Sequence, residues 1–306
     1  MRRLLAPLAD TLVVLLGVST LVFLLLNLVP GDPVDVVLGE SAQAADREAM
    51  RAALGLDQPL WQRWLGFHTG LVQGDLGESL VQRQPVTTLI AERLPATLQL
   101  AAAAFVLVLL TALPLGLLAA RFHRRWPDNA AQLFALLAMS IPNFWLGPLL
   151  VLVFSVWLGL TPVSGSTEPG NLWLPAITLG LSMAAITMRM MRSSLLEVAG
   201  QAFIQTARCK GLDETRVLLR HALPNALLPV ITLLGLQLGG LLAGAVITEV
   251  IFAWPGLGSL MVDAIRQRDY PLVQGIVLTI AFSYVVINRF SDLLAAWIDP
   301  QAGERR

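Results

Sequence analysis

Residues Glu197–Pro229, EVAGQAFIQTARCKGLDETRVLLRHALPNALLP, form a polar, arginine-bearing stretch between two long apolar stretches. The chain around it is strongly hydrophobic, since 56 % of its 306 residues are apolar and only 14 % are charged. Soluble domains carry about 25 % charged residues, so this composition indicates a protein that has lipid as its solvent. We call Glu197–Pro229 the polar segment, and its charge predicts a role on the aqueous side of a membrane.

Six apolar stretches come close to or exceed the 20 or so residues that a helical membrane span needs. They are Thr11–Val29, Thr97–Ala120, Ala131–Leu160, Leu174–Met191, Leu227–Phe252 and Leu272–Trp297. The first run is too long for the apolar core of a signal peptide, so we expect an uncleaved membrane anchor there. The sequence therefore predicts an all-α integral membrane protein with six transmembrane helices.

The distribution of arginine and lysine orients these spans. Basic residues gather at the N-terminus, after the second span, in the polar segment and at the C-terminus, whereas the loop between the third and fourth spans has none. Because cytoplasmic loops carry an excess of such residues, we expect both termini in the cytoplasm. The long loop Pro30–Pro95 is then external, with a helix over Ser41–Leu54 and another after Pro59. The apolar face of the second helix fits either a membrane interface or a lid packed on the spans.

The residue inventory argues against several activities. Lys210 is the only lysine and Gly211 follows it, so the chain has no phosphate-binding Walker A sequence. The three histidines lie far apart, and Cys209 is the only cysteine. We therefore expect no catalytic residue, no metal site and no cofactor in this chain. The formal net charge of zero gives no reason to expect a nucleic-acid partner.

A few residues inside the spans are candidates for a translocation path. Pro142 removes a backbone donor and predicts a kink in the third span, next to Asn143. Such a kink either exposes carbonyl groups to a polar passage or is absorbed by packing. In the fifth span the polar candidates are Gln237 and Glu249.

The fifth span also carries glycines with two successive G-x-x-x-G spacings. They are Gly235, Gly239, Gly240 and Gly244. Small residues let helix backbones approach closely in lipid, so we interpret them as a packing surface. A strip that faces the substrate is the alternative.

The last span carries Arg289 and Asp292, whose i, i+3 spacing places both side chains on one helix face. Charge inside a membrane is costly and suggests function, but Arg289 lies near the cytoplasmic end, which favours a structural ion pair. The spans lack an isolated carboxylate at their middle, of the kind that a proton relay uses. This disfavours an ion-gradient-driven carrier, which is the alternative from a different class of transporter.

Within the polar segment, Gln201–Lys210 predicts a short surface helix. Gly211 can end this helix in a left-handed conformation, and Asp213 can start a second helix that leads through Pro224 into the fifth span. A helix, an elbow and a second helix can be moved as a rigid lever by a soluble partner. An ordinary basic loop is the alternative interpretation.

The order of residues in this segment follows a known pattern. Gly211, nine further residues, His221, one residue and Leu223-Pro224 match G-x9-I-x-L-P except for the histidine. The segment thus resembles the EAA loop in the membrane subunits of binding-protein-dependent ABC importers. Gln205-Thr206-Ala207 replaces Glu-Ala-Ala, a departure that is usual in the peptide/nickel branch, the dipeptide or oligopeptide "B" type. Other stretches resemble this branch along the whole chain: Pro30-Gly-Asp-Pro33, Leu54-Gly-Leu-Asp-Gln-Pro59, Gly74-Asp-Leu-Gly77, Leu94-Pro-Ala-Thr97, Phe252–Gly258 and Arg268-Asp-Tyr-Pro271.

The resemblance implies a type I ABC importer (MetI-like) permease fold in the bacterial inner membrane. It implies an N-terminal anchor with an external loop (1–95), a five-helix core (96–298) with its coupling loop at 197–229, and a cytoplasmic tail (299–306). The implied partners are a second homologous permease, two ATPase subunits that bind ATP and Mg²⁺, an external solute-binding protein and membrane lipid. Coupling to the ATPase would fall to Phe203, Ala207, Arg208, Gly211, Leu223 and Pro224.

The substrate is implied only broadly. Di- and oligopeptides, glutathione, and nickel or metal chelates are all carried by permeases of this appearance. The spans hold no histidine or cysteine, so a peptide or a chelated metal is easier to accept than a free metal ion. In either case, we expect bulky or charged side chains at Ala207 or Gly211 to uncouple ATP hydrolysis from uptake.

Overall fold

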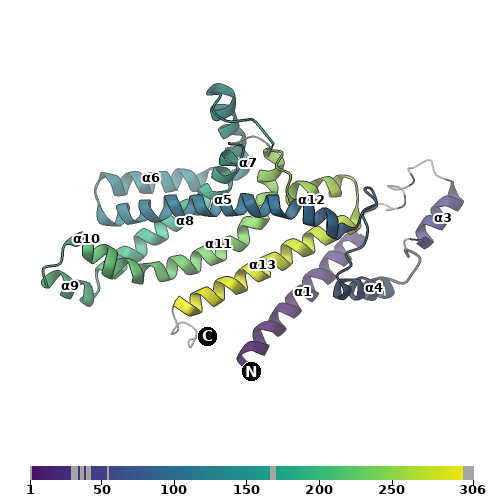
Figure 1. The fold of residues 1–306 in the computed structure, drawn as a ribbon, viewed down its shortest axis with the longest axis horizontal. Coiled ribbons are helices and arrows are strands. Elements are labelled where there is room, and N and C mark those ends of the chain that lie inside the picture. The colour runs from purple at the N-terminus through teal and green to yellow at the C-terminus, as the bar shows by residue number, and fades with distance from the viewer. Residues whose placement is uncertain are drawn as a thin grey trace. The chain divides into compact units, whose positions relative to one another are not determined.

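The computed structural model describes residues 2–28, 34, 38, 43–53, 55–165 and 170–298, and their regular structure is helical apart from one isolated antiparallel bridge between Glu78 and Pro85. Figure 1 shows these helices. The chain divides into two compact units, Met1–Thr97 with Pro255–Val285 and Leu98–Trp254 with Val286–Arg306. The predicted all-α class is confirmed.

Among the described residues, four helical runs are long and apolar enough to cross a membrane, and a bent pair would make a fifth. The four are α5 (Val86–Arg121), α8 (Trp173–Ala199), the run Glu214–Ile251 that contains α10 (Glu214–Arg216) and α11 (Leu223–Ile251), and the described part of α13 (Tyr270–Ile298). In α1 (Arg2–Leu28) the described apolar stretch is shorter, Thr11–Leu25. The total of six spans and the cytoplasmic termini stay predictions.

The third predicted span is broken rather than gently kinked. The helices α6 (Trp126–Ser140) and α7 (Asn143–Leu150), the latter extended by the π-helical turn η1 (Val151–Trp157), bend by 104°. Pro142 lies between them with φ −64° and ψ 142°, and Ile141 before it is also extended. A proline disfavours helical backbone in the residue that precedes it, so the chain leaves one helix here before it starts the next.

In the first unit, the start of α5 packs with α12 (Leu257–Arg266) and the start of α13. The buried core consists of Val86, Leu89, Ile90, Leu257, Leu260, Ala264, Leu272, Val273 and Ile276. Gly275 allows α13 to approach α5 closely, because a Cβ at this position would overlap the side chain of Val86. The loop that precedes α5 and the loop that follows α12 are therefore both attached to this core.

A buried carboxylate fixes the shape of residues 79–84, which we call the clasped loop. Asp269 is fully buried and accepts hydrogen bonds from the Ser79 hydroxyl and from the amides of Leu80 (3.2 Å) and Val81 (3.4 Å). Within the loop, the Ser79 amide donates to the Gln84 carbonyl at 2.9 Å. The loop therefore has a defined conformation that depends on a residue 190 positions away in the sequence.

Helix α4 (Leu60–Gln73) follows α3 (Ala44–Ala53) and packs on α1 with one face. The Trp64 indole donates to the Thr20 hydroxyl at 3.1 Å, and the ring of Phe67 stacks on Phe23 at 5.6 Å. This face agrees with the lid interpretation. Other apolar side chains of α4 stay exposed, as an interfacial helix requires: Leu60, Trp61 and Leu65.

Some predictions fall outside the described residues. These are the helix cap at Ser41, the helix end at Leu54, the tail 299–306 and the side chain of Asp292. The predicted end of the first external helix is nevertheless visible at Gly55, which has a positive φ of 64° after α3.

In the second unit, α8 is the central helix, because α6, α7 and α11 all pack against it. The second half of α5 also approaches it closely. A Cβ at Gly116 of α5 would lie 2.7 Å from the Cβ of Met191 and 2.9 Å from the carbonyl oxygen of Met188, both on α8. The C-terminal ends of α5 and α8 are thus in close contact.

The glycines of α11 are of different kinds. A Cβ at Gly235 would lie 2.6 Å from the Cβ of Ser291, whereas at Gly244 the nearest atom is Leu179 Cδ1 at 3.4 Å. A Cβ at Gly240 would have no atom of the structure's described part within 4 Å. The packing interpretation is confirmed at Gly235, and Gly240 is exposed on the helix surface.

We expect Gly235→Ala to lower the thermal stability of the purified complex, because the added methyl group overfills a packed site at a cost of about 1–3 kcal/mol. Gly240→Ala is the matched control. It adds the same atom to open space and should be neutral or stabilising, since alanine is the better helix former. Equal unfolding temperatures for the two variants in detergent would contradict this assignment.

Candidate coupling site

The polar segment folds into a short helix, a sharp turn and a second helix, as the sequence predicts. Helix α9 (Ala202–Cys209) ends at a turn in which Gly211 has φ +76°. A Cβ at Gly211 would meet no atom of the described residues within 4 Å, so the position requires glycine for its backbone conformation and not for lack of space. After the turn, α10 continues through the π-helical turn η2 (Val217–Ala222) into α11.

The second helix begins with a side-chain cap. The Asp213 carboxylate accepts a hydrogen bond from the amide of Thr215 at 3.0 Å. This hydrogen bond lowers the pKa of Asp213, because it favours the charged form of the carboxylate. The cap fixes where the chain turns back towards the spans.

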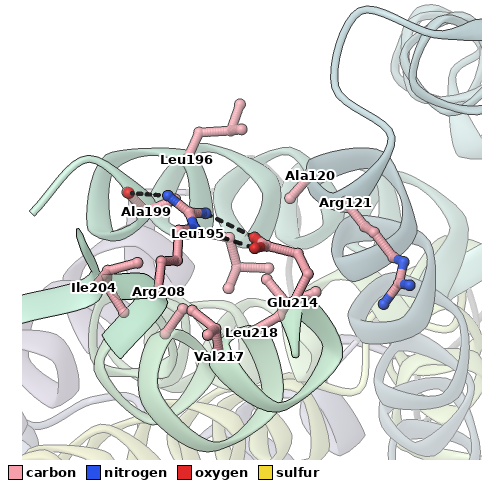
Figure 2. Close-up of a pocket in the computed structure, with 11 residues that line it drawn as sticks. Ala120, Arg121, Leu195, Leu196, Ala199, Ile204, Arg208, Glu214, Val217 and Leu218 are labelled. Carbon is pink, nitrogen blue, oxygen red and sulfur yellow. Dashed lines mark hydrogen bonds and ion pairs between the residues drawn. The ribbon is translucent and has the colours of Figure 1, made fainter. Parts of the chain in front are cut away.

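An ion pair joins the two helices across the turn. The Arg208 guanidinium donates to Glu214 with two nitrogens, Nη2–Oε1 at 2.7 Å and Nε–Oε2 at 3.1 Å. Arg208 also reaches the carbonyl oxygen of Ala199 at the end of α8, at 3.5 Å (Figure 2). The hydrogen bonds that Arg208 donates to the Glu214 carboxylate raise the pKa of Arg208. One side chain thus connects α8, α9 and α10.

A pocket of about 200 Å³ lies beneath this ion pair (Figure 2). Its apolar lining comes from α5, α8, α9 and η2, and includes Leu195, Ile204, Val217 and Leu218. Ile204 is fully buried there, so one face of α9 is seated on the bundle. Phe203, by contrast, is 42 % exposed. Helix α9 therefore has an anchored inner face and a free apolar residue on its outer face.

The remaining predicted coupling residues lie on α9 and at the start of α11. Ala207 is buried with Ile204, and Leu223 and Pro224 form the first turn of α11. The end of α5 also contacts this site, because Arg121 donates to the Thr215 hydroxyl at 2.9 Å. The structure thus brings the predicted residues together in one segment, with contacts to α5, α8 and α11.

The Arg208–Glu214 pair is expected to add little to stability. Both side chains are about half exposed (42 % and 54 %), and exposed ion pairs contribute about 0.2–1 kcal/mol. A double-mutant cycle with Arg208→Gln and Glu214→Gln, read from thermal unfolding, should give a coupling energy in this range. The value should fall in high salt. A coupling energy well above about 2 kcal/mol would mean that the pair is a main determinant of the fold.

The candidate path residues are only partly assembled. The Ser182 hydroxyl of α8 lies 3.4 Å from Asn143, which directly follows Pro142, and Thr187 of α8 donates to Gln237 at 2.9 Å. Both contacts lie on neighbouring turns of α8. Glu249 is fully buried and twelve residues beyond Gln237 on α11, about 18 Å along the axis. The structure therefore places Asn143 and Gln237 next to α8, and Glu249 lies well beyond Gln237 along α11.

The sequence did not reveal Glu214 as the partner of Arg208. A spacing of six residues does not bring side chains together on one helix, and only the left-handed turn at Gly211 makes the contact possible. Arg289 is half-buried on α13, and the predicted pair with Asp292 stays a prediction.

Comparison with known proteins defines the class. A family profile described as "Binding-protein-dependent transport system inner membrane component" matches residues 112–303, and the profile for the N-terminal part of such components matches residues 1–101. The chain belongs to this family. It is a permease of the peptide/nickel branch of ABC importers, as the resemblance implied.

Two relatives illustrate the branch. The glutathione transport system permease protein GsiC of Escherichia coli O6:H1 (strain CFT073) is 42 % identical over 92 % of each chain. The dipeptide transport system permease protein DppB of Escherichia coli (strain K12) is 41 % identical over 95 % of each chain. The similarity thus extends over nearly the whole length, including the polar segment.

Two solved structures share the fold. An amino acid ABC transporter with histidines matches with a TM-score of 0.54 at 18 % identity, over 70 % of this chain and 94 % of that one. The MetNI methionine ABC transporter, in inward-facing conformations, matches with a TM-score of 0.56 at 18 % identity, over 69 % and 96 %. The predicted MetI-like fold is confirmed.

Family membership has direct consequences. The chain is a permease subunit of the bacterial inner membrane and not an enzyme. A permease of such an importer works with an ATPase and with a substrate-binding protein.

Proposed function

We propose that this chain forms half of the translocation pathway for short peptides, with dipeptides and the tripeptide glutathione as the first candidates. The support is the full-length similarity to permeases named for these two substrates. A nickel or metal chelate carried by the same machinery is the alternative substrate. In the assembled importer, a second homologous permease completes the pathway, and two ATPase subunits bind ATP and Mg²⁺, so that this chain needs no cofactor of its own.

The polar segment is, in this proposal, the site at which one ATPase subunit docks. The observation that carries it is the division of α9 into a seated face, with buried Ile204, and an outer face with exposed Phe203 and Cys209. The glycine turn and the Arg208–Glu214 pair make this helix and α10 one body. When ATP binding closes the ATPases, the body moves and carries the ends of α8 and α11 with it.

Substrate would then pass along the surface that carries the polar contacts of α8. Asn143 and Gln237 supply an amide each, next to Ser182 and Thr187. Amides and hydroxyls can exchange hydrogen bonds with a peptide backbone without holding it tightly. The break at Pro142 supports this assignment, because it frees backbone carbonyls beside the same contacts.

The test is uptake into proteoliposomes that contain the complete importer with its binding protein. Radiolabelled glutathione, dialanine and a nickel–histidine chelate are supplied separately, with ATP inside. We expect ATP-dependent accumulation of at least one of the two peptides. Accumulation of the nickel chelate alone would favour the metal alternative. Uptake that follows a proton or sodium gradient and ignores ATP would identify an ion-driven carrier and contradict the proposal.

A further inference from the structure

A second charged cluster lies in the same helical unit, where the α5–α6 turn meets α8. Asp128, in the first turn of α6, accepts two hydrogen bonds from the Arg192 guanidinium of α8, Nε–Oδ1 at 2.6 Å and Nη2–Oδ2 at 2.8 Å. The side chain of Asp128 is only 3 % exposed and that of Arg192 is 19 % exposed, so the carboxylate side of this bidentate ion pair is buried. Bidentate pairing of arginine with a carboxylate fixes the relative orientation of the two groups as well as their distance.

The cluster also holds the turn itself. The amide of Arg124 donates to Asp128 Oδ2 at 2.9 Å. The Nδ1 atom of His123 lies 3.1 Å from both Asp128 Oδ2 and Arg192 Nη2, so it donates to the former when it carries the proton and accepts from the latter when it does not. The side-chain oxygen of Gln132 accepts a hydrogen bond from Arg192 Nη1 at 3.2 Å. We call Asp128, Arg192 and His123 the charged joint.

The position of the charged joint connects it to the polar segment. Arg192 lies seven residues before the end of α8, and α9 starts three residues after that end. Within this unit, the α5–α6 turn and α9–α10 lie at the same end of the bundle (Figure 1). Arg121, the last residue of α5, contacts Thr215 on the other side of the turn. The end of α5 is thus tied to α8 on one side and to α10 on the other.

This ion pair resists sliding because separation of its partners would leave the buried Asp128 carboxylate unpaired away from water. The apolar contacts between α6 and α8 lack this property, since packed apolar faces can exchange one neighbour for another. A joint of this kind makes two helices follow one another when one of them is displaced. In the proposed function, the displaced helix is α8, which leads into the polar segment.

We propose that the charged joint transmits the movement of the polar segment from α8 to the α5–α6 turn, and that Asp128 and Arg192 are positioning residues for transport. The inference rests on the proposed function of the polar segment. It adds to that function a route by which the displacement of α8 reaches α5 and α6. Helix α6 leads directly to the break at Pro142 and to Asn143.

The test measures uptake and ATP hydrolysis in the same proteoliposomes, with the complete importer and whichever of labelled glutathione or dialanine the wild type accumulates. In Asp128→Asn and in the neutral pair Asp128→Asn/Arg192→Gln, we expect the substrate taken up per ATP hydrolysed to fall about tenfold, within the usual range of coupling between sites. Arg192→Lys keeps the positive charge but not the bidentate geometry of the guanidinium. It should therefore lose less of the coupling than the neutral pair.

Arg189→Gln is the matched control. It removes a charge from the same helix, at an exposed side chain that donates a weak hydrogen bond to the Met139 sulfur at 3.8 Å, and it should behave as wild type. Wild-type coupling in the neutral pair would overturn the inference. Failure of every joint variant to assemble, Arg192→Lys included, would also overturn it, because the joint would then serve folding alone.

A further variant separates this inference from the function on which it rests. If Gly211→Val couples normally, the proposed role of the polar segment fails, whatever the joint variants do. If Gly211→Val uncouples and the neutral pair does not, only the charged joint is refuted.

Discussion

Gly211→Val is expected to stop uptake while ATP hydrolysis continues. Valine in the left-handed region costs roughly 1–2 kcal/mol, and its branched Cβ makes φ +76° especially unfavourable. The turn would relax to another conformation, and α9 would no longer be held against α10 by the Arg208–Glu214 pair. We expect uptake per ATP hydrolysed to fall at least about tenfold, as for the loss of a coupling energy of about 1.4 kcal/mol.

Gly211→Asn separates backbone strain from added bulk. Asparagine adopts the left-handed conformation far more readily than valine, and a side chain here would meet open space. This variant should retain most of the uptake. The explanation is wrong if asparagine and valine are equally harmful, or if the valine variant takes up substrate normally. The amount of complex that co-purifies with the ATPase shows whether assembly is preserved.

Asp269→Ala is expected to open the clasped loop. The substitution leaves the Ser79 hydroxyl and the amides of Leu80 and Val81 without their buried acceptor, and each such loss costs about 1–3 kcal/mol. A loss of even 1.4 kcal/mol raises the open population tenfold, so trypsin should cleave after Arg83 at least about ten times faster. Arg83 is exposed at the loop tip with φ +54°.

Asp75→Ala is the control for this experiment. Asp75 is exposed, and its side chain accepts a hydrogen bond from the Gly77 amide at 2.8 Å. Its loss should change the cleavage rate after Arg83 little. Equal rates in wild type and Asp269→Ala, measured on the purified complex without its binding protein, would show that Asp269 does not hold the loop.

The sequence predicted those parts of the structure that depend on local patterns. Apolar runs located the helices now seen as α5, α8, α11 and α13, and the Gly211 turn and the Asp213 cap followed from backbone preferences. The position of the break at Pro142 was also predictable. Its size was not, because a proline determines where a helix is interrupted, whereas the 104° angle depends on what the two halves pack against.

The contacts that the sequence did not reveal join residues far apart in the chain. Asp128 and Arg192 are 64 positions apart, and Ser79 and Asp269 are 190 apart. In the sequence, Arg192 is one more basic residue after the fourth span, and nothing there marks its pairing with Asp128. The motif Arg268-Asp-Tyr-Pro271 resembles the peptide/nickel branch in sequence. That its aspartate accepts hydrogen bonds from residues 79–81 appears only in the structure. Such pairs need the fold before they can be assigned.

The central claim is that α9 contacts an ATPase subunit, and the chain contains a natural probe for it. Cys209 is its only cysteine and is exposed at the end of α9. A photo-crosslinker attached to Cys209 in the assembled importer should capture an ATPase subunit, with a yield that changes on addition of ATP. In a Cys209→Ala/Val72→Cys variant, which moves the probe to the exposed end of α4 on the predicted external side, no such product should form. Absence of an ATPase crosslink from Cys209, in a complex that hydrolyses ATP and takes up substrate, would contradict the account.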